Sequence, residues 1–252
     1  MSGCNPVKYP MEPRVQLTKD EGGKLVNATQ FKSMIGGLRY LVHTRQDIAY
    51  SVGVLSRYME KPTTLHLAAV KRILRYVKGM LNYGLIYRKG QGNYMLAGFS
   101  DSDLAGNVDD RKSTGGMAFY LDESLVIWVS QKQRCVALSS CEAEFMAATA
   151  AACQCIWLNK VLSQILDAKP GPVVIYIDNK SAIDLAKNPV FHGRSKHIDI
   201  RYHFIRECVD RGDIIIKHVC SSEQRADVLT KALPKSQFEK MRQLLGIRNM
   251  QK

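Results

Sequence analysis

Two carboxylates lie at positions where functional side chains are common in α/β folds: one at the end of a predicted buried strand, and one on the apolar face of a predicted helix. Asp178 directly follows the apolar run 173–177, which is typical of a buried strand, so it lies at the carboxyl edge of a predicted sheet. Glu144 heads a row of apolar residues spaced by three and four along a predicted helix, where a charge is costly without a partner such as a metal ion. Both are candidate metal ligands, although Asp178 also fits the N-cap of the next helix.

Two further acidic positions stay open on spacing alone. Asp101 ends the predicted strand 95–101, and Asp103 shares its face by the period of two, so the pattern does not choose between them. Asp227 lies in the first turn of a predicted helix, where a carboxylate also serves simply as a partner of the helix dipole. Acids from two strand ends and two helix starts suit Mg²⁺, and two such ions about 4 Å apart hydrolyse phosphodiesters.

The elements that must position these residues follow from periodicity and from helix start and stop signals. A polar lead is followed by three predicted helices, at 29–43, 47–59 and 63 or 64–78. Strands are predicted at 84–88, 95–101, 116–121, 125–129, 173–177 and 214–219. Helices are predicted at 139–166, where Ser139 and Glu142 form a capping box, at 179–187 and 199–209, and from 224 onward. From the strand at 95 the order is β-β-β-α-β-α-α-β-α.

The charge of the chain is uneven along its length. The 252 residues carry a net charge of +13, of which residues 1–98 hold +10 and residues 99–252 hold +3. A basic balance of this size indicates a polyanionic partner. In the third helix Lys71, Arg72, Arg75 and Lys78 form one basic face, which equally fits the solvated side of an amphipathic helix.

Five long motifs in order resemble the ribonuclease H domain of copia-type retrotransposon polyproteins. They are FSDSDLAGNVDDRKSTGG, WVSQKQRCVALSSCEAEFMAA, VVIYIDNKSAIDLA, RSKHIDIRYHFIREC and SSEQRADVLTKAL, and the resemblance covers about residues 94–246. The segment MIGGLRYLVHTRQDIAYSVGVLSRYMEKPTTLHLAAVKRILRYVKG is similar to the thumb-side end of the same polyprotein's reverse transcriptase. The resemblance therefore implies a helical remnant over residues 1–90 and a ribonuclease H domain over 91–252.

The resemblance implies an α/β, ribonuclease H-like fold, a mixed five-stranded sheet flanked by helices and preceded by a small helical segment. It also implies a catalytic, metal-binding set of four acids that holds two Mg²⁺ ions, with Mn²⁺ as a substitute. Carried over motif by motif, this set is Asp101, Glu144, Asp178 and Asp227. The expected activity is endonucleolytic hydrolysis of the RNA strand of an RNA–DNA hybrid.

The expected partners are the hybrid and other parts of the polyprotein, with no membrane. The nucleic-acid-binding residues that we expect are Lys71, Arg72, Arg75, Lys78, Asn179, Lys196 and His197. No apolar run reaches the roughly 18 residues of a membrane helix, and no signal peptide begins the chain, so a cytoplasmic or nuclear location is expected, without secretion.

The chain departs from the family pattern in three places. Leu104 and Asn107 replace a Trp and an Asp of the first motif, and the loop 220–225 lacks the His found in cellular ribonucleases H. The sequence 107–110 imitates the YVDD of a polymerase but lies in the ribonuclease H region, so no polymerase activity is expected. The alternative function is a host-adopted, non-catalytic fragment that binds nucleic acid or protein as a regulator.

Overall fold

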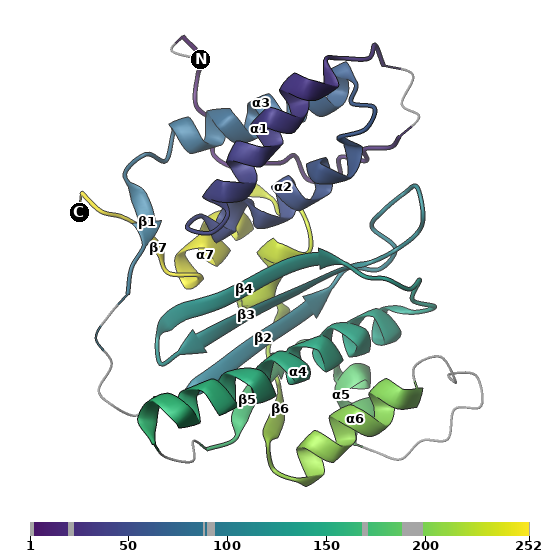
Figure 1. Cartoon of the computed structure of the whole chain (residues 1–252), viewed down its shortest axis with the longest axis vertical. Coiled ribbons are helices and arrows are strands. Elements are labelled where there is room, and N and C mark those ends of the chain that lie inside the picture. Colours follow the sequence, from purple (N-terminus) through teal and green to yellow (C-terminus); the bar gives the residue numbers. More distant parts are fainter. Residues whose placement is uncertain are drawn as a thin grey trace.

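The protein is built around a mixed five-stranded sheet. The computed structural model describes residues 3–19, 23–87, 89, 94–167, 171–187 and 199–251. The strand order is β4-β3-β2-β5-β6, with β2, β3 and β4 antiparallel and β2, β5 and β6 parallel (Figure 1). The strands are β2 (Leu96–Ser102), β3 (Thr114–Leu121), β4 (Ser124–Lys132), β5 (Val173–Ile177) and β6 (Ile214–His218). The predicted fold class, a mixed five-stranded sheet with flanking helices and a helical segment in front, is confirmed.

One face of the sheet is covered by three helices, α4 (Ser140–Leu166), α5 (Lys180–Lys187) and α6 (Asp199–Asp210). Their apolar residues form one core with the strands, in which Phe145, Ile175 and Ile205 are fully buried. By length and composition α4 is long and apolar enough to cross a membrane. However, the buried residues of α4 lie in its N-terminal half, between Glu142 and Cys155, where the helix packs on the sheet. Ser139 caps α4 by accepting from Glu142 N, while Glu142 accepts from Leu138 N rather than from Ser139 as the capping box predicted.

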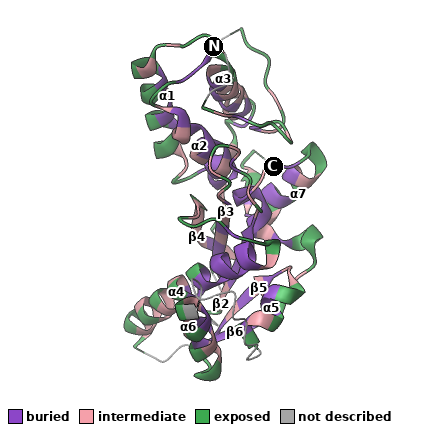
Figure 2. Cartoon of the chain, turned by 90° about the vertical axis from the view of Figure 1, so that its right-hand side faces the viewer, coloured by how far each residue is buried: buried purple, intermediate pink, exposed green. Residues whose placement is uncertain are grey.

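The opposite face is covered by the two ends of the chain together (Figures 1 and 2). From the C-terminal end come η4 (Ser221–Glu223), η5 (Arg225–Leu229) and α7 (Lys235–Leu244). From the front come α1 (Ala28–Leu41), η1 (Gln46–Ile48), α2 (Ala49–Leu55), η2 (Ser56–Tyr58) and α3 (Thr64–Lys78). The second predicted helix is thus a short α-helix with a 3₁₀ turn at each end.

A single hydrophobic core runs across the boundary predicted at residue 90. It joins Phe31, Leu55 and Ile73 of the front helices to Tyr120 of β3 and Met241 of α7. The predicted strand 84–88 is the shorter β1 (Tyr83–Leu85), which pairs antiparallel with β7 (Ile247–Asn249) in a separate two-stranded sheet. The division into 1–90 and 91–252 stays a prediction.

A buried polar network lies where the front segment meets the C-terminal helix. Arg45 donates two hydrogen bonds to the Asp47 carboxylate, from Nε at 3.0 Å and from Nη2 at 2.7 Å. The Tyr76 hydroxyl donates a short hydrogen bond to the same carboxylate. Asp47 is 1% exposed and Arg45 is 6% exposed, so removal of one charge leaves the other uncompensated in the interior.

We therefore expect Asp47→Ala to lower the free energy of unfolding by about 3–5 kcal/mol, because the Arg45 charge stays buried without its partner. Urea unfolding followed by circular dichroism measures this change. The exposed Glu60→Ala serves as the control and should stay within about 0.5 kcal/mol of the wild type. A loss below about 1 kcal/mol for Asp47→Ala contradicts a structural role for the network.

Candidate metal-binding site

Asp101 on β2 lies level with Asp178, which directly follows the neighbouring parallel strand β5. Ala97 of β2 is paired with Val174 of β5, and Phe99 with Tyr176. The same offset, continued for two residues toward the carboxyl edge, places Asp101 beside Asp178. This is the edge at which α/β sheets gather functional side chains, as the sequence predicted.

Glu144 reaches the same point from α4. Ligand oxygens of Asp101, Glu144 and Asp178 all lie within 4.8 Å of one another. The side chains are enclosed, since Asp101 is 1% exposed and Glu144 is 6% exposed. The Glu144 Oε2 atom is buried and has no hydrogen-bond partner among the residues that the structure describes. The structure thus brings together three of the four predicted carboxylates around one unsatisfied oxygen.

The geometry resolves both alternatives that spacing left open. Asp103 accepts a short hydrogen bond from Thr114 N and does not belong to the group of carboxylates within 4.8 Å of one another, so Asp101 is the member of the pair in the cluster. The N-cap of α5 is Asn179, whose Oδ1 accepts from Ala182 N at 3.1 Å, and not Asp178. Asp178 instead accepts from the Ser221 hydroxyl at 2.9 Å.

Asp227 is joined to the cluster through Lys231. It lies in η5, is 2% exposed, and its Oδ1 is 3.0 Å from Lys231 Nζ, which is 3.7 Å from Asp101 Oδ2. Thr230 also donates a short hydrogen bond to Asp101 Oδ2. Sequence reasoning missed Lys231, although its spacing of four from Asp227 is a recognisable ion-pair signal.

The absence of a side chain at Gly116 allows η5 and the residues that follow it to pack closely against the sheet. Gly116 is paired with Asp101 across β2 and β3. A Cβ atom there would lie 2.7 Å from Thr230 Cγ2 and 2.9 Å from Leu229 Cβ. Any larger residue would therefore push Thr230 and Lys231 away from Asp101.

Burial and mutual repulsion favour protonated carboxyls in this group. Burial, with the neighbouring charges of Asp101 and Asp178, raises the pKa of Glu144 to about 10. Burial and then Asp101 raise the pKa of Asp227 to about 7. Burial lowers the pKa of Lys231, but Asp101 and Asp227 outweigh it and the net direction is upward.

The donor set fits a divalent cation. Carboxylate oxygens are the hard ligands that Mg²⁺ prefers, and oxygens that share an octahedral ion at 2.0–2.1 Å lie roughly 3–4 Å apart. The spacing of Asp101, Glu144 and Asp178 approaches this value, and the unpartnered Glu144 Oε2 supplies a free donor atom. Among the described residues, this is the cluster of metal-capable side chains that the fold assembles.

The predicted nucleic-acid-binding residues are not gathered at one place. Arg72 pairs with Glu12 at 2.6 Å, Arg75 Nε donates to Asn5 O at 2.7 Å, and Lys78 Nζ donates to Cys4 O at 2.8 Å. Three cations of the α3 face thus hold the N-terminal lead. Lys71 is exposed, Asn179 caps α5, and Lys196 and His197 lie outside the described residues. Their role in binding stays a prediction.

The raised pKa of Glu144 predicts a pH-dependent penalty in the metal-free protein. The folded state holds a proton that the unfolded state releases above the ordinary glutamate pKa of 4.5, so stability falls as the pH rises toward about 10. Glu144→Gln removes this penalty, and we expect its thermal unfolding midpoint in EDTA to exceed that of the wild type increasingly between pH 5 and 9. Parallel curves for the two proteins would contradict the repulsion described here.

Comparison with known proteins places the chain among transposon polyproteins. No protein-family model matches it. It is 40% identical over 98% of its length to the retrovirus-related Pol polyprotein from transposon TNT 1-94 of Nicotiana tabacum. It is 41% identical, again over 98% of its length, to that from transposon RE1 of Arabidopsis thaliana. The chain spans 19% and 17% of these two polyproteins.

A shorter relative and two solved structures complete the comparison. The chain is 45% identical over 130 residues to the secreted RxLR effector protein 161 of Plasmopara viticola, of which it covers 91%. The N-terminal RNase H domain of Rv2228c from Mycobacterium tuberculosis aligns over 60% of this chain and 97% of its own, at 11% identity and a TM-score of 0.41. A foamy viral protease-reverse transcriptase with dsDNA aligns over 82% of this chain and 40% of its own, at 13% identity and a TM-score of 0.44. By its sequence identity to the plant polyproteins, the chain belongs to the family of retrovirus-related Pol polyproteins of transposons.

Proposed function

We propose that this chain is a divalent-metal-dependent ribonuclease H that hydrolyses the RNA strand of an RNA–DNA hybrid. The observation that carries the proposal is the cluster of Asp101, Glu144 and Asp178, whose ligand oxygens lie within 4.8 Å of one another. Holding three like charges so close, two of them buried, is unfavourable unless a cation joins them. The family resemblance of the surrounding motifs directs this metal chemistry to a phosphodiester.

Four carboxylates would hold two Mg²⁺ ions, or Mn²⁺ in their place: Asp101, Glu144, Asp178 and Asp227. When held by these residues, the ions would supply an activated water and charge stabilisation at the leaving oxygen of the scissile phosphate. Within the protein, Thr230 orients the Asp101 carboxylate, and Ser221 orients that of Asp178. Lys231 holds Asp227 toward Asp101 and offsets part of their negative charge.

A net charge of +13 fits a hybrid as the polyanionic partner, beside other parts of a polyprotein, in the cytoplasm or nucleus. The sequence that imitates a polymerase motif forms a turn instead, in which Asn107 Oδ1 accepts from Asp109 N and Asp110 pairs with Lys132 at 2.8 Å. This arrangement supports the expectation that the chain does not polymerise.

The alternative is a fragment that binds nucleic acid or protein without cleavage. It is favoured by the match to the short effector protein of Plasmopara viticola, since this chain aligns with 91% of that protein. Binding without cleavage gives no reason to bury the Asp101, Glu144 and Asp178 group, so the hydrolase remains the better-supported function.

One assay separates the two functions. We expect the wild type to cleave a labelled RNA–DNA hybrid in Mg²⁺ and to stop in EDTA, and we expect Asp178→Asn to lose at least about 100-fold in rate, because a metal ligand is removed. The control Asp184→Asn makes the same change at an exposed position of α5 and should retain the wild-type rate.

The products should carry 3′-hydroxyl and 5′-phosphate ends, as the family resemblance implies. Cleavage that survives EDTA or Asp178→Asn would show a contaminating or metal-independent nuclease. Absence of cleavage, with hybrid binding retained, would favour the non-catalytic fragment.

A further inference from the structure

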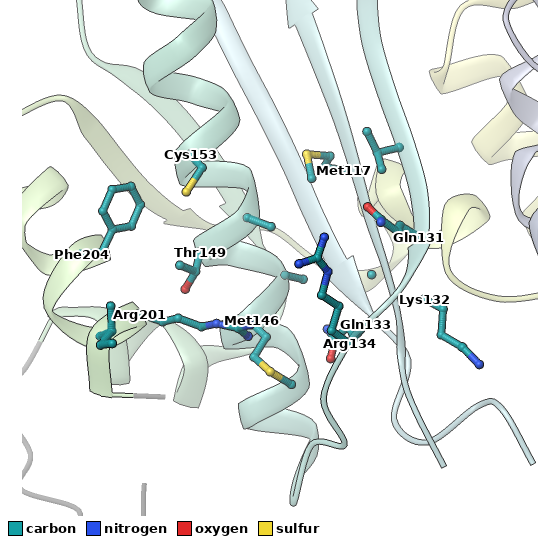
Figure 3. A pocket seen from close by; sticks show the side chains of 16 residues that line it. Met117, Gln131, Lys132, Gln133, Arg134, Met146, Thr149, Cys153, Arg201 and Phe204 are labelled. Carbon is teal, nitrogen blue, oxygen red and sulfur yellow. The ribbon is translucent and has the colours of Figure 1, made fainter. Parts of the chain in front are cut away.

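Two cavities flank the carboxyl end of β4, one on each side of this edge strand. The first, of about 460 Å³, lies between the ends of β3 and β4, α4 and α6 (Figure 3). The second, of about 650 Å³, lies between β4 and the front helices α1 and α2. Val129, Gln131 and Lys132 line both cavities, so the two are adjacent along one strand.

The cavities share a positive lining. Arg134 and Arg201 line the first, Arg39 and Arg57 line the second, and Lys132 belongs to both. In Figure 3 Arg134 extends between α4 and the strands, while Arg201 reaches from α6 toward α4. Within the described part of the chain, no carboxylate lines either cavity. We call these five cations the β4 cations.

Hydrogen bonds connect this lining to the acidic cluster. Gln133 Nε2, in the first cavity, donates to Ser102 Oγ at 3.1 Å and to Ala143 O at 2.9 Å. Ser102 adjoins Asp101 and Ala143 adjoins Glu144 in the sequence. On the other side, Arg57 Nη2 donates to Thr114 Oγ1 at 3.0 Å. A ligand bound along the β4 cations would therefore lead away from the cluster toward the front helices.

We propose that the β4 cations bind the phosphate backbone of one strand of the nucleic-acid substrate as it leaves the acidic cluster. The inference rests on the proposed function for the identity of the substrate. Phosphates need cations without competing carboxylates, and among the described residues only Lys132 of the five is paired with one, Asp110 at 2.8 Å. The apolar parts of both linings suit sugar rings. An extended acidic peptide on the edge of β4 is the rival occupant, and competition with polyglutamate distinguishes the two.

This surface differs from the α3 face that the sequence pattern suggested. Arg72, Arg75 and Lys78 of α3 already hold Glu12, Asn5 and Cys4 of the lead. By contrast Arg39 and Arg134 are exposed, and Arg201 is half-buried in the first cavity. The cations best positioned for a ligand are therefore Arg39, Arg134 and Arg201 beside β4.

Three matched triple variants test the inference, each with the loss of three positive charges. The β4 variant is Arg39→Gln, Arg134→Gln and Arg201→Gln. The α3 variant is Lys71→Gln, Arg75→Gln and Lys78→Gln. The control removes exposed lysines that line neither cavity, Lys32→Gln, Lys235→Gln and Lys240→Gln. Circular dichroism melting confirms that each variant is folded.

Binding of a labelled hybrid of about two helical turns is measured by fluorescence anisotropy in EDTA, so that it does not depend on cleavage. The β4 variant should bind the hybrid at least about tenfold more weakly. The slope of its log affinity against log salt concentration should become shallower by about three, since about three phosphate contacts are lost. The control should change by less than about threefold. An equal loss in the β4 variant and the control, or a larger loss in the α3 variant, overturns the inference.

A second measurement avoids any dependence on charge. A photo-crosslinking amino acid at Gln131, which lines both cavities, should crosslink to the hybrid, and polyglutamate at equal charge should not block it. Crosslinking that polyglutamate abolishes would assign the surface to an acidic peptide and overturn the inference. If the wild type fails to cleave hybrid but the β4 variant still binds it less tightly than the control, the hydrolase proposal fails while the inference stands.

Discussion

Repulsion between buried carboxylates is the constraint on which the arrangement of this chain depends. Asp101 of β2, Glu144 of α4 and Asp178, which directly follows β5, have oxygens held within 4.8 Å of one another, and Asp101 and Glu144 are buried. Such a group cannot assemble by attraction, so the sheet register, the packing of α4 and the hydrogen bonds from Thr230 and Ser221 must hold it in place. Lys231 offsets part of the charge from the opposite face. The fold therefore stores an unfavourable interaction at the point where a divalent cation would relieve it.

The front helices contribute to the same site from behind the sheet. Asp227 lies in η5, and its neighbours Ala226, Val228 and Leu229 belong to the core that η1, α2 and α3 share with α7. Loss of the front segment would therefore expose the packing that fixes the fourth carboxylate. The buried Arg45–Asp47–Tyr76 network lies in the same region. It adds specific polar interactions to the apolar contact between the front helices and the C-terminal segment. The helices are thus both a support for the site and, through Arg39 and Arg57, one wall of the second cavity beside β4.

Local patterns were sufficient for most of the sheet and for two of the acids. A continuous apolar run followed by an acid predicted both β5 and the position of Asp178, because a strand buried on both faces consists of consecutive apolar residues. Spacing could not separate Asp101 from Asp103, since the distinction depends on Thr114, which lies in another strand. The pairing of β1 with β7 joins segments more than 150 residues apart and has no periodic signal in either. Lys231 was missed because its role arises only when η5 packs over Gly116.

We propose that the acidic cluster binds two divalent ions, and the number of bound ions can be counted. Electron paramagnetic resonance of free Mn²⁺, titrated into the protein with a non-hydrolysable hybrid analogue, gives the number bound per chain. Two bound ions are expected for the wild type, with a loss of binding in Asp101→Asn, because Asp101 lies at the centre of the group. No bound ion, or binding unchanged by Asp101→Asn, would contradict a metal-dependent site at this edge of the sheet.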